Sequence, residues 1–156
     1  MTARILSGTQ VAGEIRAELT TNVKKLKEKT GITPGLAVVL VGEDPASISY
    51  VTAKSKGAEE VGILEQTFRM PATSSGQDVL NMVEQLNRDP KWHGILVQLP
   101  LPKHIDEKKV LIAIRPDKDV DGFHPVNVGK MLIGEPDFLP CTPHGVQQIL
   151  MRSGYD

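Results

Sequence analysis

A short, unbroken run of apolar residues constrains the fold of this chain more than any other feature. Residues 36–41 have the sequence Leu-Ala-Val-Val-Leu-Val, which is rich in β-branched side chains. A run of this kind, without alternating polar residues, is typical of a strand buried on both faces of a parallel sheet. Gly42 ends the run, and residues 43–47 supply turn and cap residues for a following helix. The run therefore predicts a central strand in an α/β layer.

The segments around this strand alternate between helix and strand. Apolar residues recur every three or four positions over residues 10–29, and Gly31 ends that predicted helix. The further predicted elements are a helix that ends at Gly62, a strand over 63–68, a helix opened by a capping box at Ser74–Gln77 and closed at Asp89, a strand over 94–98 and a helix over 106–114. This order predicts an α/β three-layer sandwich with a mostly parallel sheet and right-handed crossovers.

The last part of the chain is predicted to be less regular. Residues 116–125 are too polar and too rich in turn formers for the core, so they are expected to form a surface loop. Their aspartates do not form a calcium loop, because Val128 stands where an EF-hand needs a glutamate. A short helix is predicted over 126–133, and Thr142 and Pro143 are predicted as the cap and first residue of a final amphipathic helix.

Composition narrows the range of partners and compartments. The 156 residues suit one domain, and the formal net charge of −1 provides no broad field for nucleic acid or an anionic membrane. No apolar stretch approaches the roughly 18 residues of a membrane span, and residues 1–7 lack a signal-peptide core. The single Cys141 favours a reducing compartment. We therefore expect a cytoplasmic protein without nucleic-acid or membrane partners.

Histidine and cysteine patterns give no sign of a metal site. The four histidines fall in separate loops or caps, and no pair has the spacing of metal ligands. Cys141, between prolines, has no surroundings in the sequence that would favour the thiolate, so a structural role is expected for it. We expect no metal ion.

Polar residues follow the predicted strands at one edge of the sheet. Tyr50 and Lys54 are four positions apart and share one face of the helix after residues 36–41. Gln98 ends a later strand, and Asp121 lies in the loop beyond it. Open α/β sheets bind ligands at the carboxyl ends of their strands. We therefore expect these side chains to converge on one site.

The types of these residues suit proton transfer beside a bound heterocycle. A lysine that moves protons near neutral pH needs a pKa well below roughly 10.4, and an apolar pocket lowers it by penalising the charged form. Tyr50 and residues 99–100 are candidates for that apolar wall. Gln98 is neutral, so it orients a lysine without fixing its charge, and Asp121 suits a ligand edge with paired N–H donors. Each residue alone also fits an ordinary role in packing, capping or solvation.

Several ordered motifs together resemble the bifunctional methylenetetrahydrofolate dehydrogenase/cyclohydrolase family, and the resemblance covers nearly the whole chain. The motifs are residues 42–47 followed by Tyr50 and Lys54, Gly62-Ile63, residues 94–102, residues 116–123, Asn127-x-Gly129 and residues 140–143. The resemblance implies that Tyr50 stacks on the folate pterin, Lys54 is the catalytic acid/base, Gln98 tunes and holds the lysine, and Asp121 binds the pterin edge. The implied substrate-binding set is Tyr50, Val51, Thr52, Ala53, Lys54, Val97, Gln98, Leu99 and Asp121.

The family continues into a Rossmann domain that binds NADP, and this chain has no G-x-G-x-x-G or P-loop sequence. The resemblance therefore implies a folate-binding catalytic domain over 1–140, with residues 141–156 as the start of a connector helix. It implies that dehydrogenase activity is absent from this chain alone. A homodimer is implied for the intact protein.

Two other interpretations remain open at this point. The chain could act only as a folate-binding module, because hydrolysis could need the cleft that the second domain closes. A receiver or flavodoxin-like signalling domain shares the alternation of strands and helices. A receiver, however, needs an acidic cluster and a phosphoaccepting aspartate, and the first long strand is followed only by Glu43 and Asp44.

Overall fold

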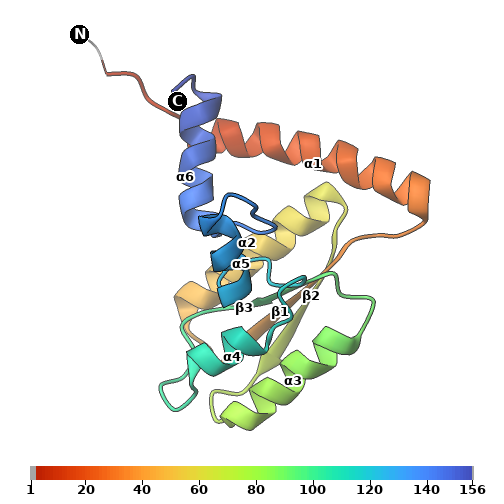
Figure 1. Cartoon of the computed structure of the whole chain (residues 1–156), viewed down its shortest axis with the longest axis vertical. Coiled ribbons are helices and arrows are strands. Elements are labelled where there is room, and N and C mark those ends of the chain that lie inside the picture. Colours follow the sequence, from red (N-terminus) through yellow and green to blue (C-terminus); the bar gives the residue numbers. More distant parts are fainter. Residues whose placement is uncertain (1–2, 156) are drawn as a thin grey trace.

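The computed structural model describes residues 3–155, and it forms an α/β sandwich around a three-stranded parallel sheet of order β2-β1-β3 (Figure 1). The elements in chain order are α1 (Gly8–Thr30), β1 (Gly35–Val41), α2 (Pro45–Val61), β2 (Leu64–Met70), α3 (Gly76–Arg88), β3 (Gly94–Val97), α4 (Glu107–Ala113), α5 (Pro125–Leu132) and α6 (Cys141–Arg152). The predicted fold class and the alternation of strands and helices are confirmed.

The apolar run forms β1, which is buried on both faces as predicted. Ala37, Val39 and Val41 of β1 pack into a core with side chains of α3 and α4. Val38 and Leu40 point to the other face, where they pack with Val51 of α2. Helices α1 and α2 lie on that second face, and α3 and α4 lie on the first (Figure 1). The three layers follow from the two apolar faces of one strand.

The start of α2 is fixed by the cap that the sequence predicts. Asp44 accepts a hydrogen bond from the Ser47 N–H at 2.8 Å, and Pro45 occupies the first helical position. This bond is the main cause that lowers the pKa of Asp44. Because the helix starts at a fixed place directly after β1, Tyr50 and Lys54 come to lie beside the carboxyl end of the sheet.

Two predicted helix starts are wrong by one or more residues. The capping box lies at Ser75 and Asp78, not at Ser74–Gln77, because the Asp78 carboxylate reaches both the N–H and the hydroxyl of Ser75. Helix α6 begins at Cys141 after Pro140, without a side-chain cap, so Thr142 is not its cap. His144 consequently lies inside α6 and not in a loop or cap.

The prediction that residues 116–125 form only a surface loop is also wrong. Lys118 is 8% exposed and Asp119 is 1% exposed. Both are buried because their polar atoms have protein partners: Lys118 Nζ donates to backbone carbonyls at the end of α3, and Asp119 accepts hydrogen bonds from residues 124 and 127. Burial of charged groups is tolerated when such partners are present.

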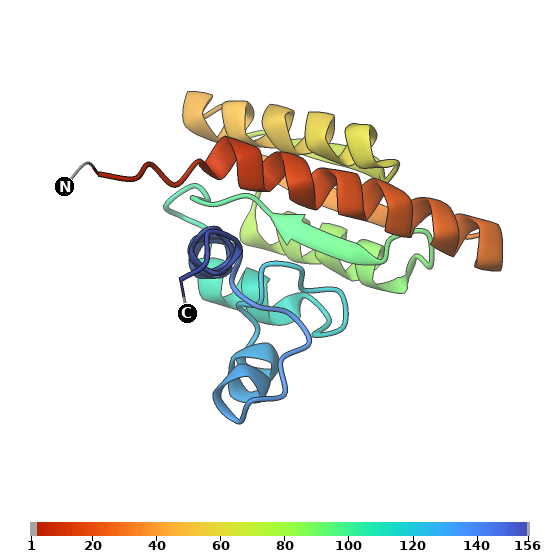
Figure 2. The same cartoon turned by 90° about the horizontal axis from the view of Figure 1, so that it is seen from above.

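Helix α6 packs against the first half of α1, as the views in Figures 1 and 2 agree. Arg152 donates two hydrogen bonds to the Glu18 carboxylate, at 2.6 and 2.8 Å. Val146, Leu150 and Met151 of α6 remain exposed. The division into residues 1–140 and a connector over 141–156 stays a prediction, and Asp156 lies outside the described residues. No helix within residues 3–155 is both long and apolar enough to cross a membrane.

Candidate active site

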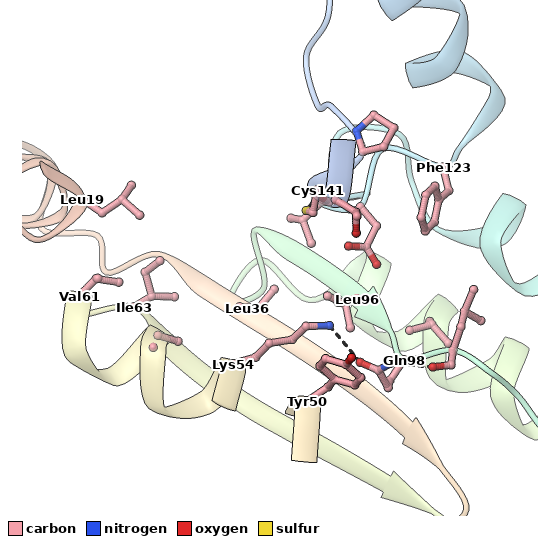
Figure 3. A pocket seen from close by; sticks show the side chains of 18 of the residues that line it. Leu19, Leu36, Tyr50, Lys54, Val61, Ile63, Leu96, Gln98, Phe123 and Cys141 are labelled. Atoms are coloured by element: carbon pink, nitrogen blue, oxygen red, sulfur yellow. Dashed lines mark hydrogen bonds between the residues drawn. The ribbon is translucent and has the colours of Figure 1, made fainter. Parts of the chain in front are cut away.

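A cleft of about 810 Å³ runs along β3, from residues near the start of β1 and β2 to Gln98 and Leu99 at the carboxyl end of β3. Helix α2 forms one wall, and the loop after α4 with the first turn of α6 forms the opposite wall (Figure 3). The end away from the polar residues is apolar and is lined by Leu19, Leu36, Val61 and Ile63. The cleft therefore combines a long apolar surface with a few polar side chains, as small-molecule sites do.

Lys54 and Gln98 meet in the cleft, which confirms their predicted convergence. Lys54 Nζ donates to Gln98 Oε1 at 2.9 Å, and Gln98 Nε2 donates to the Leu99 carbonyl at 2.7 Å. Because the amide nitrogen is used by Leu99, Gln98 presents an acceptor to Lys54. An amine and an ammonium both have N–H groups for such an acceptor, so the contact persists in either protonation state.

Tyr50 lies beside this pair on the same face of α2 (Figure 3). Tyr50 is 64% exposed, whereas Lys54 is half-buried. The cause is geometric, because α2 lies at the open rim of the cleft and no described residue covers the tyrosine ring. Its exposed aromatic face is available for stacking on a planar ligand.

Asp121 also lines the cleft, and its surroundings shift its protonation equilibrium. Burial is the largest effect and raises the pKa of Asp121, while the positive charge of Lys54 and a contact with Cys141 lower it by less. A carboxylate that is partly desolvated gains more from a ligand that donates two N–H bonds than an exposed carboxylate does. Asp121 and Lys54 therefore occupy one electrostatic environment, as the sequence predicts.

Sequence reasoning missed the contribution of α6 to this cleft. Cys141, Thr142 and Pro143 line it, so the predicted division after residue 140 cuts through the site. The signal was present, because residues 140–143 form one of the motifs that carry the family resemblance. Burial of the thiol and, next, the charge of Asp121 raise the pKa of Cys141. A raised pKa keeps the thiol protonated, which argues against a nucleophilic role.

The other predicted substrate-binding residues are placed in different surroundings. Val97 and Leu99 line the cleft. Val51 is 1% exposed and belongs to the core between α2 and the sheet. Thr52 and Ala53 are exposed on α2 but are not among the residues that line the cleft. The prediction for these three side chains ignored the helical period, which turns positions 51–53 away from the face shared by Tyr50 and Lys54.

Comparison with protein families gives one clear match. Residues 6–121 match the model of the tetrahydrofolate dehydrogenase/cyclohydrolase catalytic domain. The chain belongs to this family. The tetrahydrofolate dehydrogenase/cyclohydrolase match includes Tyr50, Lys54, Gln98 and Asp121, and it places the chain among the catalytic domains of folate one-carbon metabolism.

Relatives and solved structures agree with the family assignment. The chain is 59% identical over 156 residues to the bifunctional protein FolD of Geobacillus thermodenitrificans, covering 100% of this chain and 55% of the relative. It is 56% identical to FolD of Syntrophobacter fumaroxidans, covering 99% of this chain and 52% of the relative. The chain spans about half the length of the curated relatives it matches.

Crystal structures of family members have the same fold. The FolD dehydrogenase/cyclohydrolase of Campylobacter jejuni superposes with a TM-score of 0.94 at 44% identity, covering 98% of this chain and 54% of that protein. The FolD of Trypanosoma brucei, solved with NADP cofactor and an inhibitor, superposes with a TM-score of 0.95 at 38% identity, covering 99% of this chain and 53% of that protein.

Proposed function

We propose that this chain is the folate-binding and proton-transferring part of an enzyme with two activities. The enzyme oxidises 5,10-methylenetetrahydrofolate with NADP and hydrolyses 5,10-methenyltetrahydrofolate to 10-formyltetrahydrofolate. The observation that carries this proposal is the hydrogen bond of 2.9 Å from Lys54 Nζ to Gln98 Oε1 inside the cleft that Asp121 also lines. Family membership supports the substrate class.

The pterin ring of the folate binds between the two walls in this proposal. Asp121 accepts N–H bonds from the aminopyrimidine edge, and the exposed ring of Tyr50 stacks on the pterin plane. Val97 and Leu99 line the cleft and provide apolar contact. This orientation brings the carbon bridge between N5 and N10 of the folate toward Lys54, which comes from the same face of α2 as Tyr50.

Lys54 moves the protons of the hydrolytic step. Water attacks the methenyl carbon, a C–O bond forms, and the neutral amine of Lys54 takes one proton from the water. The resulting ammonium then donates that proton to N5 as the C–N5 bond breaks, and the hydroxyl proton leaves to solvent as the formyl C=O forms. One water is consumed and one net proton is released. Gln98 holds Nζ in place through both states of the lysine.

NADP accepts a hydride when it is bound, but the described residues do not form a site for its pyrophosphate. Pyrophosphate groups bind to free backbone N–H groups at helix N-termini. The helix start that borders the cleft is that of α6, where Pro140 and Pro143 have no N–H to donate, so only Cys141 and Thr142 offer backbone N–H groups, and no glycine-rich loop precedes them. We therefore expect no NADPH formation by this chain with 5,10-methylenetetrahydrofolate and excess NADP. A steady increase in the absorbance of NADPH would contradict this expectation.

The test of the proposal uses binding and hydrolysis together. Isothermal titration calorimetry with 5-formyltetrahydrofolate, a stable reduced folate, should show one site per chain. Loss of the near-ultraviolet absorbance of 5,10-methenyltetrahydrofolate should be faster with the chain than without it. Binding without faster hydrolysis would favour the folate-binding module, and absence of binding would overturn the proposal.

A further inference from the structure

The loop that carries Asp121 is attached to the rest of the molecule at three places. The first attachment is to β3. The Ile95 N–H donates to the Lys118 carbonyl at 2.7 Å, and Ile95 and Asp119 form an isolated parallel bridge. Because β3 also leads into Gln98, one strand positions both Gln98 and the loop that carries Asp121.

The second attachment is to the end of α3. Lys118 Nζ donates to the carbonyl oxygens of Leu86, Asn87 and Asp89 at 3.0, 2.9 and 3.0 Å. Carbonyls in the last turn of a helix lack partners within the helix and attract positive charge. The lysine therefore satisfies the end of α3 and ties the loop to it.

The third attachment is a buried pair, Asp119 and Asn127, each 1% exposed. Asp119 Oδ2 accepts from the His124 N–H at 2.8 Å and from Asn127 Nδ2 at 2.9 Å. Asn127 Nδ2 also donates to the Pro116 carbonyl at 2.9 Å. The pair thus joins the start of the loop to the first turn of α5 across the segment that contains Asp121.

The segment between these anchors has little freedom. The Gly122 N–H donates to the Asp119 carbonyl at 3.2 Å, which closes a turn around Asp121. Val120 packs directly over Gly94 of β3, where an added Cβ would lie 2.5 Å from Val120 Cγ1. Asp121 therefore directly follows Asp119, which is held by side-chain hydrogen bonds, and Val120, which is held by packing against the strand.

We propose that Asp119 and Asn127 are positioning residues that hold Asp121 in the orientation that binds the pterin edge. This inference rests on the proposed function. A carboxylate meets two N–H donors at once only when its backbone is fixed, and a flexible loop would lose conformational entropy on each binding event. The buried pair removes that cost in advance. Neither side chain needs to touch the ligand.

The test compares two buried asparagines, Asn127 of α5 and Asn87 of α3. Asn127→Ala removes the bond to Asp119, whereas Asn87→Ala removes bonds to the Ala113 carbonyl and the Arg115 N–H on the other side. Calorimetric affinity for 5-formyltetrahydrofolate should fall about tenfold for Asn127→Ala and less than about twofold for Asn87→Ala, while thermal stability falls in both. If Asn127→Ala does not fold, Asn127→Ser replaces it.

A double-mutant cycle separates positioning from general stability. Asn127→Ala should weaken binding in the parent but not in the Asp121→Ala background. Asp119→Asn, which keeps an acceptor oxygen for both donors, should bind within about twofold of the parent, whereas Asp119→Ala should resemble Asn127→Ala. Equal losses in both backgrounds, or no loss at all, would refute the positioning role. If Asp121→Ala itself leaves affinity unchanged, the proposed function of Asp121 is wrong, and the positioning role fails with it.

Discussion

The two walls of the cleft are built in different ways. We call the face of α2 with Tyr50 and Lys54 the helix wall, and the segment with Asp121 between α4 and α5 the loop wall. The helix wall depends on one cap at Asp44 and on the helical period. The loop wall depends on buried hydrogen bonds of Lys118, Asp119 and Asn127. Regular structure positions Lys54, and a specific network of side-chain hydrogen bonds positions the loop that carries Asp121.

Because the two walls are built differently, we expect one wall to determine turnover and the other to determine affinity. Under the proposed function, Lys54 is expected to act mainly in the transition state, whereas Asp121 is expected to contact the ground state and the transition state alike. Substitutions in the helix wall should therefore reduce turnover, and substitutions in the loop wall should reduce affinity. The predictions below test this division.

The largest expected effect is that of Lys54→Met on hydrolysis of 5,10-methenyltetrahydrofolate. General acid–base groups contribute roughly 10²- to 10⁴-fold, so the rate above the uncatalysed reaction should become undetectable. Lys56→Met is the matched control, because Lys56 is exposed on the same helix and does not line the cleft. The assay follows the loss of substrate absorbance in an intact two-domain relative carrying each change. Hydrolysis within a factor of a few of the parent would show that Lys54 only positions the substrate.

The second effect concerns Asp121→Ala in the loop wall. Loss of charged hydrogen bonds to the pterin edge should cost roughly 1.5 to 3 kcal/mol of binding, with a smaller change in turnover. The measurements are the calorimetric affinity of this chain and KM with kcat in an intact relative. A normal KM with a collapsed kcat would assign a chemical role to Asp121 and erase the contrast between the walls.

The raised pKa of Asp121 also predicts a pH dependence of stability. Burial raises this pKa above 3.8 in the folded state, so the folded chain binds the proton more tightly than the unfolded chain. The free energy of unfolding therefore falls as the pH rises from the ordinary aspartate value through the raised one. Asp121→Asn should be more stable than the parent at neutral pH, and this difference should disappear at acid pH. Urea unfolding at several pH values measures it, and a difference that grows toward acid pH would contradict the sign.

A smaller effect is expected for Gln98→Glu, which places a carboxylate where Gln98 Oε1 now accepts from Lys54 Nζ at 2.9 Å. The negative charge favours the ammonium form, so steps that need the neutral amine should slow about tenfold and recover partly at higher pH. The measurement is a pH profile of hydrolysis in an intact relative, corrected for the spontaneous reaction. A profile parallel to that of the parent would show that Gln98 does not act through Lys54.

The two walls also differ in how far the sequence predicts them. The Lys54–Gln98 contact follows from a helix that starts directly after one strand and from the end of a neighbouring parallel strand. Both are local patterns with known geometry. The burial of Asp119 has no local pattern, because its partners at 124 and 127 become neighbours only after α5 docks. The same reason explains why the contribution of Cys141 to the cleft was missed. Periodicity predicts elements, and it does not predict which polar side chains satisfy one another.

The last contrast between the two walls concerns folding stability alone and uses one glycine in each wall. Gly122 in the loop wall has φ of 67°, and an added Cβ would lie 3.0 Å from backbone atoms of Leu139 and Pro140. Gly122→Ala should therefore lower the free energy of unfolding by about 1 to 3 kcal/mol. Gly57 in α2 has no atom within 4 Å of the added Cβ, so Gly57→Ala should raise it by about 0.5 to 1 kcal/mol. Urea midpoints with unchanged m-values measure both effects.

The two substitutions change the free energy of unfolding in opposite directions if backbone propensity determines the stability of the helix wall and fixed contacts determine that of the loop wall. Stabilisation by both substitutions would mean that the loop relaxes freely, and the contrast between the two walls would then be lost.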